Sequence, residues 1–441
     1  MKIFVDSLGC PKAFVDVERM CYFLLKDDHL LVSSPEEADL VIVNTCGFTE
    51  AAKKENIQAI LYYADLKKKK PSLKLVVTGC LSERYKEKLL ELIPEIDSAI
   101  GVKDQSIVGK VIRDQQKGFL DCQQFNDTAY TEERTLTFSG LNYAYLKISE
   151  GCNRSCSFCV IPSIRGKQRS RRIEDILKEA EKLREEGISE LIIISEDTLS
   201  YGVDLYGGRK IIKLLERLGE FDFPWIRLMY LFPEDYIYEV VDFLSENERF
   251  CNYIDLPFQH VSKKILGSMK RKGDFEYYLE MLEKIRKINP VISVRSAFIV
   301  GYPGETEEDF KLLKEFLEIA KLNRVGFFEY SDEEGAFSYN LRPKVSKKIA
   351  RKRIRELQKL QTYISKELLE RFVGKKIKCI FDGEILLNRK YLLFRTEFDA
   401  PEIDGVVKVL SCDDEIFESS FATVKILRAQ THDLVGKIVE I

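Results

Sequence analysis

The sequence has no apolar run long enough to span a membrane, and it carries almost no net charge. Its 441 residues have a formal charge of only −3, so no basic field draws the chain to nucleic acid or to a lipid surface. The stretch Met1–Asp6 is too short, and too soon charged, for a secretory signal peptide. Eleven cysteines in a chain that is not a small disulfide scaffold indicate metal chemistry in a reducing compartment. We therefore expect a cytoplasmic protein.

Three of the cysteines lie close together. Cys152, Cys156 and Cys159 have the spacing C-x3-C-x2-C and follow the alternating run Tyr143–Ile148. Three soft thiolates in one loop suit an iron–sulfur cluster that keeps one iron free for a small molecule. The alternatives are a structural zinc loop without its fourth ligand, or three buried thiols. No His or Cys follows near enough to complete a local zinc site, so the pattern favours the cluster.

The first 117 residues predict an α/β unit. Short β-branched runs at 2–6, 40–44 and 74–78 alternate with helical patterns at 13–26, 49–68 and 82–93, which is typical of a parallel sheet covered by helices. Cys10, Cys46 and Cys80 each come just after one of these strands. Because parallel strands bind ligands at their carboxyl ends, we expect the three thiols at a common edge. The alternative is three buried cysteines that act as small hydrophobes.

The rest of the chain changes character twice. Residues 118–139 are polar and are interpreted as a linker. A second α/β series follows, with helical patterns at 173–186, 275–287 and 307–322, and predicts an incomplete barrel of six βα units. A charged helix is expected over 346–372. Four short β-rich runs near the end predict a small barrel of the oligonucleotide-binding type. The expected strands of the second and third units are 143–148, 191–195, 226–230, 253–256, 294–300, 325–330, 376–382, 391–396, 406–410 and 422–427.

Several motifs resemble one enzyme family. Residues 149–166, followed by Arg169-Ser-Arg171, resemble the methylthiotransferase branch of the radical S-adenosylmethionine (SAM) superfamily. Within it, the chain resembles the RimO-type ribosomal protein methylthiotransferases at 8–12, 15–18, 197–202, 298–310 and 400–405. The resemblance implies a methylthiotransferase domain with a flavodoxin-like parallel sheet (1–117), a linker (118–139), a partial (βα)6 radical SAM barrel (140–370) and an all-β, OB-like TRAM domain (371–441).

The resemblance also implies cofactors and partners. They are two 4Fe-4S clusters, SAM, sulfide or polysulfide as the sulfur source, and an electron donor such as flavodoxin or ferredoxin. The Cys10/Cys46/Cys80 cluster would carry the sulfur, and the other would cleave SAM to a 5′-deoxyadenosyl radical. The residues expected at the SAM site are Phe158, Glu196, Asp197, Gln259, Arg295, Gly301 and Gly304. Those expected to dock the substrate are Arg165, Arg171, Asp399, Glu402 and Asp404.

Some of these positions have plainer readings. The turn 301–306 suits close approach to a flat ligand, yet it also reads as a βα turn capped by Thr306. Glu196 stands where relatives usually carry Gln. His260 is a lone histidine of the kind that is more often structural. The basic run at 165–172 suits carboxylate recognition or a solvated helix approach. The remaining cysteines have no ligand spacing and read as packing residues: Cys21, Cys122, Cys251, Cys379 and Cys412.

The substrate class follows from charge. Residues 371–441 hold 11 Lys plus Arg against 12 Asp plus Glu, a balance that suits a basic protein better than an RNA backbone. The Pro11-Lys12 pair after Cys10 points the same way by resemblance, and the resemblance implies β-methylthiolation of an aspartate in protein twelve of the small ribosomal subunit. A transfer-RNA methylthiotransferase and a non-catalytic iron–sulfur protein remain the alternatives. Ala13, where relatives commonly carry Asn, and a C-terminal stretch 431–436 without the usual aromatic residues depart from the family pattern.

Overall fold

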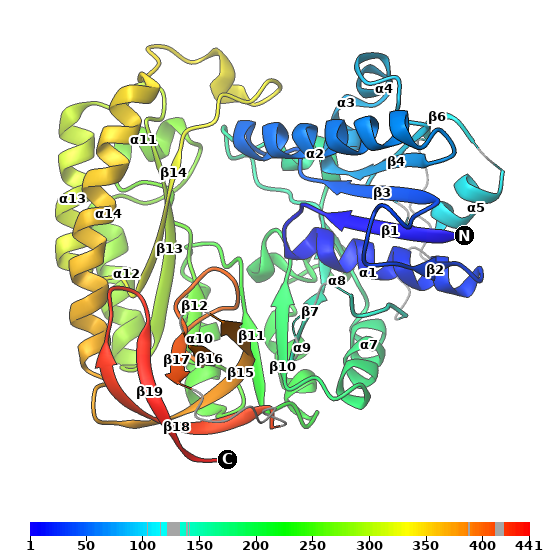
Figure 1. Ribbon diagram of the computed structural model, residues 1–441. Coiled ribbons are helices and arrows are strands. Elements are labelled where there is room, and N and C mark those ends of the chain that lie inside the picture. Colours follow the sequence, from blue (N-terminus) through cyan, green and yellow to red (C-terminus); the bar gives the residue numbers. More distant parts are fainter. Residues whose placement is uncertain are drawn as a thin grey trace.

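The computed structural model describes residues 1–103, 105–114, 116–120, 133–137, 140, 142–386, 389–410 and 419–441. Most of the expected linker, as well as Cys122 and Cys412, lies outside these ranges. Figure 1 shows an N-terminal α/β unit beside a larger α/β unit, with a strand-only barrel (red) at the base of the latter. No helix of the described part is both long and apolar enough to cross a lipid bilayer.

The N-terminal unit is a parallel sheet in the order β2-β1-β3-β4-β5-β6. Its central strands carry a continuous apolar run because helices cover both faces. The strands are β1 (Lys2–Ser7), β2 (Leu30–Leu31), β3 (Leu40–Thr45), β4 (Lys74–Gly79), β5 (Ser98–Ile100) and β6 (Gly118–Leu120). The helices are α1 (Pro11–Lys26), α2 (Glu50–Lys69), α3 (Cys80–Tyr85), α4 (Glu87–Leu92), η1 (Gln105–Ile107) and α5 (Val108–Arg113).

Two features of this unit differ from the sequence prediction. The single helix expected over 82–93 is split into α3 and α4, because Lys86 adopts a left-handed conformation with φ of 48°. The expected linker begins too early, because residues 118–120 form β6 and pair with β5 at the sheet edge. Three-residue strands carry too little alternation to stand out in a sequence.

The second unit is the predicted six-stranded partial barrel. Its strands form two parallel three-stranded sheets, β11-β10-β7 and β12-β13-β14, that meet through a bridge between Ile226 and Phe250. The described parts of β7 and β14 do not pair, so the barrel is open between them. The strands are β7 (Tyr143–Lys147), β10 (Glu190–Ile194), β11 (Trp225–Leu228), β12 (Tyr253–Asp255), β13 (Ser293–Val300) and β14 (Arg324–Glu329), with a small hairpin of β8 (Ser149–Glu150) and β9 (Arg169–Ser170).

Helices surround this partial barrel and bury the largest apolar core of the molecule. Three of them match the predicted patterns to within two residues, because their apolar positions recur at helical spacing. The helices are α6 (Ile161–Arg165), α7 (Ile173–Glu185), η3 (Thr198–Ser200), α8 (Val203–Tyr206), α9 (Ile211–Gly219), α10 (Ile237–Glu246), α11 (Lys263–Ser268), α12 (Phe275–Ile288), α13 (Glu307–Ala320), η4 (Phe337–Asn340) and α14 (Lys347–Glu370).

The third unit is a closed barrel in the order β15-β16-β17-β19-β18, here called the C-terminal barrel. The sequence analysis missed β19, which closes the barrel between β17 and β18. The bounds are β15 (Lys376–Leu386), β16 (Lys390–Thr396), β17 (Val407–Leu410), β18 (Phe421–Ala429) and β19 (Leu434–Glu440).

The C-terminal barrel packs against the amino ends of the partial-barrel strands. Glu190, the first residue of β10, is fully buried and pairs with Arg227 (2.6 Å) and with Arg395 of the C-terminal barrel (2.5 Å). Trp225, at the start of β11, meets the ring of Phe421 edge-on at 5.0 Å. These contacts close the amino end of the partial barrel and leave its carboxyl end for chemistry.

This packing corrects the prediction for the acidic docking residues. Asp399 pairs with Arg324 (2.8 Å), and Asp404 accepts a hydrogen bond from the Tyr253 hydroxyl (2.8 Å). Glu402 is exposed, yet it accepts a hydrogen bond from the Tyr143 hydroxyl (2.8 Å). Because their carboxylates are already bonded to the partial barrel, these residues join two units of the chain and do not form a free acidic surface.

Candidate active site

The first cysteine set lies at the carboxyl edge of the N-terminal sheet. Cys10 follows β1, Cys46 follows β3 and Cys80 begins α3 after β4, and these three strands are neighbours in the sheet. Cys80 interacts electrostatically with both of the others, and all three are free thiols. The strand counting made from the sequence therefore placed them correctly at one edge.

Two glycines let these loops approach each other. Gly47 follows Cys46, and a Cβ atom there would lie 2.7 Å from the carbonyl oxygen of Cys80. Gly79 precedes Cys80 with φ of 99°, and a Cβ atom there would collide with the Thr45 carbonyl. The Cys46 amide also donates to the buried Asn56 side chain (2.8 Å), which anchors its loop to α2. The backbone is thus built to bring Cys46 and Cys80 together.

The second set, Cys152, Cys156 and Cys159, lies in the loop after β8. Each sulfur accepts a hydrogen bond from an N–H group. The backbone amides of Arg154 and Ile161 lie 3.4 Å from the Cys152 and Cys159 sulfurs, and Arg271 Nη1 lies 3.8 Å from the Cys156 sulfur. Burial raises the pKa of Cys152 to about 11 and of Cys159 to about 12, while these amide donors oppose the rise. Such donors stabilise thiolate charge once a metal has displaced the protons.

A small apolar contact joins the two sets. Cys80 packs in one cluster with Val160 and Ile164, which follow Cys159, and Phe48, which follows Cys46, lies against them. Arg165, at the end of α6, also interacts with the Cys80 thiol. Burial raises the pKa of that thiol to about 12, and the guanidinium opposes the rise. The second cysteine loop therefore lies directly against the first.

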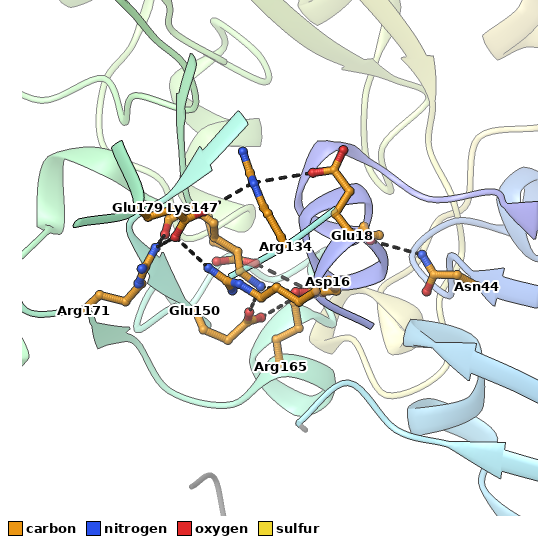
Figure 2. Close-up of polar contacts among 12 residues, drawn as sticks. Asp16, Glu18, Asn44, Arg134, Lys147, Glu150, Arg165, Arg171 and Glu179 are labelled. Carbon is orange, nitrogen blue, oxygen red and sulfur yellow. Dashed lines mark hydrogen bonds and ion pairs between the residues drawn. The ribbon is translucent and has the colours of Figure 1, made fainter. Parts of the chain in front are cut away.

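A buried ion network holds this interface. Figure 2 shows Lys147 and Arg165 between the carboxylates of Asp16 on α1 and Glu150 on β8. Arg165 lies 2.6 Å from Glu150 and 3.1 Å from Asp16. Burial alone would raise the pKa of Glu150, but Arg165 and Lys147 hold it well below its usual range. The carboxylates are therefore charged partners of the two cations.

The same network corrects the prediction for Arg165 and Arg171. Both side chains are only 1% exposed, and Arg171 pairs with the buried Glu179 at 2.6 Å. Arg19 of α1 and Arg134 share that carboxylate, at 3.1 and 3.4 Å. Neither predicted docking arginine reaches a surface, because internal carboxylates already occupy both guanidinium groups. Arg165 joins the N-terminal unit to the partial barrel through Asp16. Arg171 instead pairs with Glu179, the carboxylate that Arg19 contacts from the N-terminal unit.

This shared carboxylate gives a stability prediction. Glu179→Gln keeps the volume but removes a carboxylate that three buried guanidinium groups share, one of which, Arg134, also pairs with Glu18 at 3.6 Å, so we expect a loss of about 3–5 kcal/mol in urea unfolding at pH 7. Burial raises the pKa of Glu179, but its arginine partners outweigh burial and lower it from 4.5 to about 2. A lowered carboxylate pKa stabilises the fold above pH 4.5, and this contribution is lost as the pH falls toward 2.

The control for this substitution lies on the same helix. Glu181→Gln changes an exposed residue of α7 and is expected to alter stability by less than about 0.5 kcal/mol. A Glu179→Gln variant as stable as this control at pH 7 would contradict the role given to the carboxylate.

The predicted SAM residues do not all lie in one place. Near the second cysteine set, Asp197 accepts from Arg154 at 2.5 Å, Glu196 is buried without a hydrogen-bond partner, and Phe158 packs on the barrel core. The turn with Gly301 and Gly304 ends β13, and Thr306 caps α13 as expected. Arg295 is held by Asp255 (3.0 Å) and Asp404 (3.5 Å) on the side of the C-terminal barrel.

The Gln259-His260 pair is chiefly structural. Gln259 has φ of 72° and bridges to Phe298 through its backbone. His260 is fully buried, and its Nδ1 accepts hydrogen bonds from the amides of Val261 and Ser262 (both 2.9 Å). The sequence analysis treated a lone histidine as more often structural, and His260 is structural, because its ring supports a backbone turn. Cys21, Cys251 and Cys379 are buried free thiols, as predicted.

Sequence reasoning missed Arg271. Its guanidinium contacts the Cys156 sulfur, donates to the Pro257 carbonyl (2.6 Å) and lies over the Phe232 ring (3.9 Å). It lies in the Lys270-Arg271-Lys272 run, far along the sequence from the cysteine loop, and no motif marked it. Only the fold brings it to the sulfur.

The donor chemistry of the site fits iron–sulfur clusters better than a single ion. Within the described ranges, no three Cys, His, Asp or Glu side chains are arranged to hold one metal ion. In a cubane cluster each thiolate binds a different iron, so three separated thiols in a partly open loop match that group. In both sets the thiols come from separate positions and are partly exposed, except Cys80, which is buried.

Comparison with known proteins gives a consistent result along the whole chain. Profiles of Uncharacterized protein family UPF0004, the Radical SAM superfamily and the TRAM domain match residues 2–101, 146–317 and 373–439. The chain is 41% identical to "Ribosomal protein uS12 methylthiotransferase RimO" of Clostridium tetani, over 100% of this chain and 98% of that protein. It is 38% identical to the protein of the same name from Myxococcus xanthus, over 99% of this chain and 92% of that protein.

Solved structures show the fold. The radical SAM methyltransferase TsrM from Kitasatospora setae, with cobalamin and a [4Fe-4S] cluster bound, matches with a TM-score of 0.55 at 15% identity. The match covers 85% of this chain and 78% of TsrM. Membership of the radical SAM superfamily supports SAM and an iron–sulfur cluster as cofactors of this enzyme. From its full-length similarity to the curated relatives, the chain belongs to the RimO family of ribosomal protein uS12 methylthiotransferases.

Proposed function

We propose that the chain adds a methylthio group to the β-carbon of an aspartate in ribosomal protein uS12, using two 4Fe-4S clusters. Cys152, Cys156 and Cys159 would hold the cluster that binds SAM. Cys10, Cys46 and Cys80 would hold the cluster that carries the sulfur. We assign these roles to residues 140–370 and 1–117, with residues 371–441 as the TRAM domain.

One observation carries this proposal: the two cysteine sets lie at one interface. Val160 and Ile164, next to the second set, pack against Cys80 of the first. An enzyme that only cleaves SAM needs one set of cluster-binding cysteines. A protein that only carries electrons does not need the partial barrel. Two sets at the carboxyl ends of two parallel sheets suit a reaction that uses both on the same substrate.

The residues of the chain position the reaction and exclude water from it. When bound, the clusters and SAM supply one-electron cleavage of SAM and the methylthio sulfur. Amide N–H groups and Arg271 hold negative charge on the sulfurs of the second set. The N-terminal unit covers the carboxyl end of the partial barrel through two further contacts, in which Lys53 and Arg84 pair with Glu333 beyond β14 (2.6 and 2.5 Å). A covered site protects a radical from solvent.

We place SAM beside the second set, near Asp197 and the Gly301–Gly304 turn. The electron donor would be a small carrier such as flavodoxin or ferredoxin, and sulfide or polysulfide would supply the sulfur. The near-neutral charge of residues 371–441 supports a basic ribosomal protein as partner over transfer RNA, because RNA binding requires neutralisation of phosphates.

A competition assay tests the substrate. The reduced enzyme receives uS12 and transfer RNA in one tube, with SAM and sulfide, and both are analysed by mass spectrometry. We expect the added mass on an aspartate of uS12 and none on adenosine. Transfer-RNA binding should be weak at physiological salt; each phosphate contact would cost about 0.9 log units of affinity per log unit of salt. A methylthio group found only on transfer RNA would overturn the choice of substrate and leave the cluster assignments standing.

A further inference from the structure

Lys12 is a buried cation without a carboxylate partner. It follows Cys10 on α1, and its side chain reaches the loops after two partial-barrel strands. The ammonium lies 3.4 Å from the centre of the Tyr230 ring and 3.4 Å from the Ser195 carbonyl oxygen. An ammonium has three donors, so one long hydrogen bond leaves most of its capacity unused. No described carboxylate forms an ion pair with it.

The neighbouring cations differ from Lys12 in this respect. Lys147 and Arg165 are paired with Asp16 and Glu150, and Arg154 is paired with Asp197 and Glu234. A buried charge without a partner is costly, so a site that keeps one suits an incoming ion of opposite sign. Lys12 interacts electrostatically with Cys10 of the first cysteine set, and no carboxylate of the described residues forms an ion pair with it.

Its surroundings are arranged for a ligand. Tyr230, which lies under the ammonium, has φ of 61°, a conformation that non-glycine residues rarely adopt and that is commonest at functional sites. Glu196, an electrostatic neighbour of Lys12, lies 3.9 Å from the Arg165 guanidinium, and neither of its carboxylate oxygens has a hydrogen bond. A cation without an ion pair and a carboxylate without a hydrogen bond thus lie at the contact between the two cysteine sets, where they suit a ligand with both an anionic group and an N–H donor.

We propose that Lys12 binds the side-chain carboxylate of the target aspartate, an inference that rests on the proposed function. In aspartate the β-carbon is one bond from the carboxylate carbon. A carboxylate held by Lys12, two residues from Cys10, therefore places the carbon to be modified beside the sulfur-carrying set. An adenosine has no carboxylate, so the same contact favours the ribosomal protein over transfer RNA.

Peptide binding tests this role apart from turnover. A fluorescent uS12 peptide with the target aspartate, and its Asp→Asn analogue, are titrated by anisotropy with anaerobic, cluster-loaded enzyme and SAM. The wild type is expected to prefer the aspartate peptide about ten- to a hundredfold, the range of a charge-assisted hydrogen bond. Lys12→Met should weaken binding of the aspartate peptide by that factor and bind both peptides alike. Lys12→Arg should keep the preference.

Controls separate Lys12 from the cofactors. Lys311→Met, an exposed change on α13, should leave both affinities unchanged. Iron content, the electron paramagnetic resonance spectrum and SAM affinity should be the same in Lys12→Met as in the wild type. A retained preference in Lys12→Met, or a loss of SAM binding there, would overturn the inference alone. A wild-type enzyme that binds the two peptides equally would overturn the proposed substrate and this inference with it.

Discussion

A variant with Cys152, Cys156 and Cys159 all replaced by alanine is expected to hold about half of the wild-type iron and to form no 5′-deoxyadenosine. The three sulfurs are the ligands we assign to one cluster, and a cluster that loses all its thiolates cannot assemble. The first set, on a separate sheet, keeps its own loops and should still bind iron. Iron analysis and chromatography of the SAM cleavage products measure both effects.

A matched control removes the same number of thiols elsewhere. Cys21, Cys251 and Cys379 are buried and free, and lie in three different parts of the fold. Their triple replacement by alanine should leave iron content and SAM cleavage unchanged, apart from a modest loss of stability from the cavities. Equal iron in the Cys152/Cys156/Cys159 variant and this control would refute the assignment of the second cluster.

The converse variant separates the two roles. Replacement of Cys10, Cys46 and Cys80 by alanine should leave SAM cleavage measurable, because Cys152, Cys156 and Cys159 and their N–H donors are untouched. Methylthiolated peptide should fall below detection, a loss of at least about a thousandfold, because the sulfur-carrying group is gone.

The readouts of this second variant are 5′-deoxyadenosine and peptide mass in the same reaction. Product formation at the wild-type rate would show that the sulfur reaches the substrate without the first set. A variant that lost both activities would show that the first set is also required for SAM cleavage, and the proposed division of labour would then be wrong.

The sequence predicted the structure best where a local pattern of residues is compatible with only one kind of secondary structure. β-Branched runs predicted the central strands. Because parallel strands run in the same direction, the positions of Cys10, Cys46 and Cys80 after three such strands predicted that they lie at one edge of the sheet. The sequence was least informative about charge. From the sequence alone, Asp399 and Arg165 would be expected on the surface. In the structure each is buried and forms an ion pair with a residue far away in the sequence.

The missed contacts share a physical cause. The pair between Arg19 and Glu179 joins residues 160 positions apart, and Arg271 reaches Cys156 across 115 positions. No local periodicity encodes such pairs; they exist only after two units have docked. The break between α3 and α4 was missed for a different reason: lysine is a good helix former, so nothing in the local sequence marks the positive φ of Lys86.

The closed amino end of the partial barrel has a consequence for how the enzyme meets the ribosome. Glu190 pairs with Arg227 within the partial barrel and with Arg395 of the C-terminal barrel, so detachment of the C-terminal barrel would break a buried ion pair that joins the two units. The C-terminal barrel is therefore rigidly packed against the partial barrel and is not a flexibly linked domain. The partial barrel and the C-terminal barrel should therefore approach the target as one rigid body. A TRAM domain transplanted from a relative would need a partner for Glu190 at the position of Arg395.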